Sequence, residues 1–146
     1  MTAPTSETEK LSHQLIELYG KLSFWEQDVV KNSPLSPAQM HTVEIVGHGA
    51  KGGAALRMKE LAKKMGVTTG TLTVMVDRLE QQGLLKRTPH ETDRRSYLIA
   101  LTEKGQDLFA EHHQYHLHLI EEITANLSTE EQTLFSTVLE KIIGQM

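Results

Sequence analysis

The chain has 146 residues, a formal net charge of −4 and no cysteine. These values predict one domain, or one domain with helical extensions, and they exclude a disulfide framework, a thiolate zinc site and a cysteine nucleophile. No segment approaches the roughly 18 apolar residues of a membrane span, and the first ten residues lack the basic flank and apolar run of a signal peptide. We therefore expect a cytoplasmic protein that has no membrane partner.

The charge of the chain is unevenly distributed. Residues 57 to 95 carry nine Lys/Arg and five Asp/Glu, a local charge of +4 that leaves −8 for the remainder. A basic middle between acidic flanks favours contact between this part of the chain and nucleic-acid phosphates. Chance variation of surface charge is the alternative explanation, because charge asymmetry alone is only suggestive.

Two amphipathic helices are predicted before residue 50. The first extends from Glu7 to Lys31, where apolar residues recur every three or four positions. These residues are Leu11, Leu15, Leu18, Leu22, Trp25 and Val29. Ser36 and Pro37 then start a second helix that runs to about His48, since serine is a favoured N-cap and proline suits the first helical position. The glycine-rich stretch from Gly49 to Ala55 is interpreted as a spacer, because it lacks the ending of a phosphate-binding loop.

Residues 58 to 85 are predicted to form two short helices joined by a sharp turn. Gly66 ends the first helix, because glycine enters the left-handed region without a Cβ clash, and Thr68 caps the second. The second helix has one apolar face, formed by Leu72, Met75, Val76 and Leu79, and an opposite face formed by Thr69, Gly70, Thr71, Thr73 and Asp77. This helix-turn-helix layout makes the second helix a candidate recognition helix for DNA. Its residues expected to contact double-stranded DNA are Thr68, Thr69, Gly70, Thr71, Thr73 and Arg78.

A β-hairpin is predicted directly after the recognition helix. Apolar and polar residues alternate from Leu85 and again from Tyr97 to Leu101, on either side of the polar loop PHETDRR. A hairpin in this position is a wing, and its tip carries Arg94 and Arg95, which suit a narrow minor groove. The alternative for Arg95 is a stiffening ion pair with Asp93 or Glu91.

Two further helices complete the chain. Thr102 opens a helix that runs to about Asn126, and Ser128 caps a last helix with Glu131 completing a capping box. The last helix is predicted to bury Leu134, Phe135, Val138, Leu139, Ile142 and Ile143. The first and last helices carry more apolar surface than a winged module can cover, so we expect a homodimer. The expected organisation of the single chain, residues 1–146, is a DNA-binding region at 35–101 and a helical dimerisation region at 6–32 and 102–146.

Eight histidines occur in the chain, five of them between His90 and His118. His112 and His116 lie one turn apart on the apolar stripe of their helix. Three interpretations stay open for this pair. They are a hydrogen-bonded structural pair, an effector pocket lined by His41, His112, Tyr115 and His116, and a metal site formed by His112, His116, Glu111 and His41.

An enzyme is the interpretation from a different class, with the same histidines in a hydrolytic metal site. That chemistry needs an open coordination position and a general base. The sequence contains neither an HExxH motif nor a paired carboxylate constellation. We therefore expect no enzymatic activity and no cofactor.

The chain resembles the MarR family of winged helix-turn-helix regulators over nearly its whole length. The resemblance rests on KELAKKMGVTTGTLTVMVDRLEQQGLLKR, on the DRR of the wing at Asp93 to Arg95, and on LTEKG at Leu101 to Gly105. It implies a mainly α fold with a winged helix-turn-helix, long terminal dimerisation helices and a wing of two to three β-strands. It also implies a homodimeric transcriptional regulator, a repressor, on a near-palindromic operator, with an effector pocket between the DNA-binding and dimerisation regions. Val74 replaces a frequent arginine, and Arg57 stands where a Ser/Thr cap is usual, so fewer base contacts are expected.

Two narrower resemblances concern the effector. QMHTVEIVG at Gln39 to Gly47 and HHQYH at His112 to His116 are similar to the streptococcal fatty-acid-synthesis repressors of the family, whose effector is an acyl chain on a carrier protein. Zinc-sensing members have a similar histidine cluster on this helix, which implies a metal-responsive regulator as the alternative. Met40, however, occupies a position where those sensors carry a carboxylate.

Overall fold

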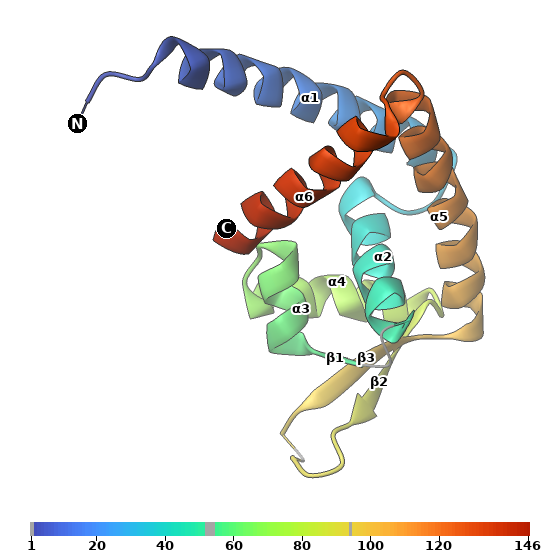
Figure 1. The fold of residues 1–146 in the computed structure, drawn as a ribbon. Helices are drawn as coiled ribbons and strands as arrows, with labels where there is room; N and C mark the ends of the chain where they lie inside the picture. Colours follow the sequence, from blue (N-terminus) through green and yellow to red (C-terminus); the bar gives the residue numbers. More distant parts are fainter. Residues whose placement is uncertain (1, 52–54, 94) are drawn as a thin grey trace. The chain divides into compact units, whose positions relative to one another are not determined.

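The computed structural model describes residues 2–51, 55–93 and 95–146, and its chain divides into two compact units, residues 1–109 and 110–146. The elements follow in the order α1 (Ser6–Val30), α2 (Pro37–Lys51), β1 (Leu56–Arg57), α3 (Met58–Met65), α4 (Thr69–Gln81), β2 (Leu85–Pro89), β3 (Tyr97–Leu101), α5 (Glu103–Thr124) and α6 (Thr129–Gln145) (Figure 1). The predicted mainly α fold with a winged helix-turn-helix is confirmed. Among the described residues, no helix combines the length and apolar character needed to cross a membrane.

The core of the first unit lies where α2, α3 and α4 pack against a small sheet. Val43, Leu61, Leu72, Leu79 and Ile99 are among its fully buried side chains. Burial of a leucine or valine side chain stabilises a fold by about 1.5–3 kcal/mol, so these contacts set the rotation of each helix about its axis. The apolar face predicted for the recognition helix is confirmed, with Met75 half-buried at its margin.

The sheet has three antiparallel strands in the order β1-β3-β2. Strands β2 and β3 pair from Leu85 opposite Leu101 to Pro89 opposite Tyr97, and this hairpin projects beyond the helices of its unit (Figure 1). The predicted wing is therefore present. Strand β1 was not predicted individually, because two residues are too few to show an alternating pattern.

Helix α2 is longer than predicted. It continues past His48 to Lys51, so the first residues of the predicted spacer are helical, while residues 52–54 lie outside the described part. A glycine inside a helix costs only about 1 kcal/mol relative to alanine, and the buried side chains of Val43 and Val46 outweigh that cost. Gly49, interpreted as the first residue of the spacer, therefore lies inside the helix.

The prediction that α6 buries its apolar side chains is wrong for the chain as described. Leu134, Phe135, Val138, Leu139, Ile142 and Ile143 are between 39% and 70% exposed. In α1 the only buried residue is Val30, and Leu11, Leu15, Leu18 and Leu22 are exposed. Helical periodicity identifies an apolar face, but it does not say which surface covers that face.

Candidate nucleic-acid interface

The turn before α4 is fixed by glycine and threonine. Gly66 has a φ of +67° and ends α3, and the Val67 N–H donates to the Ala62 carbonyl at 3.1 Å. The Thr68 hydroxyl then accepts a hydrogen bond from the Thr71 N–H at 3.1 Å, as predicted for an N-cap. These bonds satisfy backbone groups that would otherwise be left unpaired at the adjoining helix ends.

The face of α4 opposite the core is polar and exposed. Leu72, Val76 and Leu79 are fully buried, and this leaves Thr69, Gly70, Thr71 and Thr73 at the surface. The Thr73 hydroxyl donates to the Thr69 carbonyl at 2.7 Å. Its oxygen can still accept a hydrogen bond, and its methyl group is available for apolar contact. This face therefore offers the groups that meet base edges and thymine methyls in a major groove.

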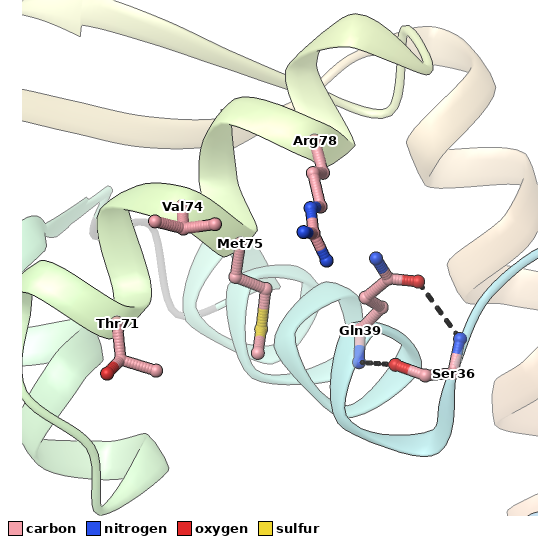
Figure 2. A pocket seen from close by; sticks show the side chains of 6 residues that line it. All are labelled: Ser36, Gln39, Thr71, Val74, Met75 and Arg78. Atoms are coloured by element: carbon pink, nitrogen blue, oxygen red, sulfur yellow. Dashed lines mark hydrogen bonds between the residues drawn. The ribbon is translucent and has the colours of Figure 1, made fainter.

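A groove of about 320 Å³ lies between the start of α2 and the exposed side of α4. It is lined by Ser36, Gln39, Thr71, Val74, Met75 and Arg78 (Figure 2). Ser36 and Gln39 form a reciprocal cap, in which the Ser36 N–H donates to Gln39 Oε1 at 3.0 Å and the Gln39 N–H donates to Ser36 Oγ at 3.2 Å. Because the Gln39 carbonyl is used in this cap, its amide nitrogen is the donor that remains.

Arg78 is placed to act with Gln39. Figure 2 shows its side chain pointing from α4 toward Gln39. A guanidinium and an amide nitrogen both donate, and two donors on one groove suit an acceptor such as a phosphate oxygen. Sequence reasoning identified Arg78 as a DNA-binding residue and Ser36 as an N-cap, but it missed Gln39 and the place of Ser36 in this groove. The S-x-x-Q spacing of a capping box was a local signal that could have identified Gln39 as the partner of Ser36.

The wing is held by a histidine that sequence reasoning did not single out. His90 Nε2 lies 2.8 Å from Nη2 of Arg57, the residue that precedes α3. His90 Nδ1 accepts from the N–H groups of Thr92 and Asp93, each at 3.3 Å. The imidazole thus connects the turn between β2 and β3 to Arg57, the last residue of β1.

The structure describes one of the two predicted wing arginines. Arg95 is exposed, and its backbone N–H donates to Asp93 Oδ1 at 3.0 Å, so this carboxylate shapes the turn. Arg94 lies outside the described residues. DNA contact by either arginine stays a prediction.

The predicted effector residues lie in both units. In the second unit, His112 is buried and His116 half-buried, and their Nε2 atoms are 3.2 Å apart. Tyr115 is exposed, with its ring centre 6.4 Å from that of His112, and Glu111 is exposed as well. A shared pocket or metal site for these residues stays a prediction.

In the first unit, a groove of about 340 Å³ lies between α1 and α2. It is lined by Tyr19, Leu22, Ser23, Glu26, Pro37, Ala38 and His41. Helix α2 also buries a carboxylate, Glu44, which sequence reasoning missed. Its position one turn after Met40 on the apolar face was the available signal.

Comparison with known proteins gives consistent results. The model of the MarR family matches residues 35–97. The multiple antibiotic resistance protein MarR of Salmonella typhimurium is 31% identical over 143 residues, covering 93% of this chain and 97% of that protein. Streptococcus pneumoniae FabT in complex with DNA has a TM-score of 0.78 at 24% identity, covering 93% of this chain and 94% of FabT. NadR in complex with 4-hydroxyphenylacetate has a TM-score of 0.81 at 20% identity, covering 97% of each chain.

Proposed function

The chain belongs to the MarR family of winged helix-turn-helix transcriptional regulators, and from that membership we propose that it represses transcription as a homodimer bound to a near-palindromic operator. The observation that carries the proposal is the exposed polar face of α4, which lies beside the Gln39 and Arg78 donors. Relatives in this family are regulators, which are generally not enzymes. This favours a regulator over a histidine-based hydrolase.

The DNA-binding region, residues 35–101, is assigned contacts with the major groove, the DNA backbone and the minor groove. Thr68, Thr69, Gly70, Thr71 and Thr73 enter the major groove with α4, and Arg78 binds the backbone together with Gln39. Arg94 and Arg95 bring the wing to the flanking minor groove. Contacts with phosphate provide affinity and register, while contacts with base edges provide sequence choice.

The homodimer is proposed from the exposed apolar faces of α1 and α6. Isolated exposed leucines need no explanation, but a continuous row along each of two helices exceeds what a monomer usually leaves in water. A second copy, related by a two-fold axis, would cover both rows. In such a dimer the two α4 helices enter successive major grooves about 34 Å apart.

We infer that a small effector regulates DNA binding through the residues predicted for it. His41 contributes the groove of the first unit, and His112, Tyr115 and His116 contribute their part of α5. The groove beside His41 has apolar walls from Tyr19 and Leu22, which suits an aromatic acid or an acyl chain.

A zinc-responsive regulator is the second candidate, supported by one distance. Two nitrogens bound to a tetrahedral zinc ion at about 2.0–2.1 Å lie roughly 3.3 Å apart. The Nε2 atoms of His112 and His116 are separated by 3.2 Å. Glu111 and His41 are the further ligands assigned in this alternative.

The proposal is tested by selecting a binding site from random double-stranded DNA and measuring its affinity against salt concentration. About six phosphate contacts give a slope near −5 for log K against log salt. Each titration is repeated with zinc, 4-hydroxyphenylacetate and palmitoyl-acyl carrier protein. No enrichment of any sequence, or an affinity independent of salt, would overturn the proposed function. A response to zinc alone would select the second candidate.

A further inference from the structure

Val74 lies at the centre of the outward face of α4. The side chains of Leu72, Val76 and Leu79 are fully buried on the opposite side of this helix. Successive residues of an α-helix are rotated by about 100°, so position 74 points away from the middle of that buried row. The valine is 52% exposed and lines the α4 side of the groove in Figure 2. It therefore belongs to the face that is proposed to enter the major groove.

The fold does not explain a valine at this position. Burial contributes little, because about half of the residue is in water. A β-branched side chain is also less favourable in a helix than alanine, leucine or arginine. Among the described residues between 31 and 109, the exposed large apolar side chains are Val74 and Tyr97. A single exposed valine is unremarkable on an ordinary surface, but this one lies in the middle of a polar face that meets a partner.

Gly70, one turn before Val74, leaves the valine side chain open on that side. Helical side chains point toward the N-terminus of their helix, so Val74 lies over the turn that holds Gly70. The fold has room for a larger residue here, since a Cβ atom at Gly70 would meet Oγ1 of Thr68 at 3.9 Å, and the φ of Gly70 is not positive. Glycine is less favourable than alanine within a helix. Its presence favours close approach of a partner to Val74.

The chemistry of valine limits what it can recognise in a major groove. Its side chain has neither a donor nor an acceptor. Beside the amino group of cytosine or the acceptors of guanine, it would displace water without replacing the lost hydrogen bond. Of the four bases, thymine alone presents a methyl group on this edge. Contact between that methyl group and Val74 removes apolar surface of both from water.

We propose that Val74 is a specificity-determining residue, which selects thymine at one base pair in each half of the operator by contact with the C5-methyl group. This inference rests on the proposed function, since it assumes that α4 enters the major groove. An arginine at position 74 would instead favour guanine, so the valine changes which base is selected. 5-Methylcytosine has a methyl group at the same ring position as thymine, and Val74 therefore distinguishes it from cytosine.

The test removes the methyl group from the DNA and the side chain from the protein. Each thymine of the selected operator is replaced in turn by uracil, which lacks the C5-methyl group and keeps the O4 acceptor. The affinity for each duplex is measured with the full-length chain and with Val74→Ala. Thr73→Ser is the matched control, because it removes one methyl group from the neighbouring residue of the same helix. The thermal midpoint of unfolding is measured for all three chains.

Uracil at one position in a half of the operator is expected to weaken wild-type binding about fourfold, the equivalent of about one methylene group returned to water. Val74→Ala should bind the thymine and uracil duplexes equally at that position, whereas Thr73→Ser should keep the difference there. The ratio should not change with salt concentration, because no charge is altered. The thermal midpoint of Val74→Ala should not fall, since alanine favours a helix and no core contact is lost.

A second arm adds the methyl group to a different base. Cytosine and 5-methylcytosine are each placed at the position of the critical thymine. The wild-type chain should bind the 5-methylcytosine duplex about fourfold more tightly than the cytosine duplex, the same contribution as in the uracil arm. Val74→Ala should bind both equally. This arm alters no protein contact, so a change in folding cannot produce its result.

Two results would overturn the inference. One is a wild-type affinity that no uracil substitution reduces. The other is a Val74→Ala variant that keeps every uracil effect of the wild type, which would assign the methyl contacts to other residues. If the wild-type chain itself selects no DNA, the proposed function fails. If it selects a sequence and either of these two results is obtained, only this inference fails.

Discussion

Gly47 of α2 lies directly against the ring of Phe109 on α5. A Cβ atom at residue 47 would come closer than 3.0 Å to three carbons of that ring. His48 meets the same ring edge-on, with the ring centres 5.2 Å apart. The start of α5 is therefore anchored on the backbone of α2, at a point where no larger residue fits.

Gly47→Ala is predicted to destabilise the fold by about 1–3 kcal/mol, the usual cost of overpacking a core. Gly20→Ala is the matched control, because it also lies within a helix and a Cβ there meets nothing within 4 Å. This control should be neutral or stabilise the chain by up to about 1 kcal/mol. Chemical unfolding of both variants provides the comparison. Equal effects would show that the Phe109 contact has no energetic importance.

The elements predicted correctly are those defined by nearby residues. The turn at Gly66, the Thr68 cap and the capping box of Ser128 and Glu131 depend on partners within a few positions. The contacts of Gly47 with Phe109 and of Arg57 with His90 join residues far apart in the chain. Local propensity and periodicity contain no information on such pairs, so sequence reasoning missed them.

Variants of Thr73 can distinguish a base contact made by its methyl group from one made by its hydroxyl group. Its hydroxyl is occupied by the Thr69 carbonyl, so we predict that the methyl group contributes most to sequence choice. Thr73→Ser removes the methyl and should reduce discrimination at one base pair by about 1–3 kcal/mol, whereas Thr73→Val should retain it. Competition between the operator and single-base variants measures this discrimination. The opposite order of the two variants would assign the contact to the hydroxyl.

Arg95 is predicted to act mainly on phosphate or on minor-groove potential. Arg95→Ala should weaken binding to most sequences and reduce the salt slope by about 1. Asp93 still accepts from the backbone N–H of residue 95 in this variant, so the turn of the wing should persist. Amide hydrogen exchange of the hairpin checks that point. An unchanged affinity and slope would show that the wing arginine does not contact DNA.

The exposed face of α6 gives a prediction on assembly. Phe135 and Leu139 lie one turn apart and are 40% and 39% exposed. Phe135→Asp and Leu139→Asp each introduce a charge into the proposed dimer interface, which is strongly unfavourable without a partner. Light scattering at micromolar concentration should change from dimer to monomer, and operator affinity should fall in parallel. Glu140→Gln on the same helix serves as the control and should remain dimeric.

Hydroxyl-radical footprinting of the selected operator, combined with native mass spectrometry of the complex, tests the central claim most directly. The account predicts two copies of the chain on one duplex and a two-fold symmetric footprint. Its two major-groove sites should have centres about 34 Å apart, each flanked by a protected minor groove. A single chain on one asymmetric half-site, or protection that does not depend on Thr71, Thr73 and Arg78, would contradict it.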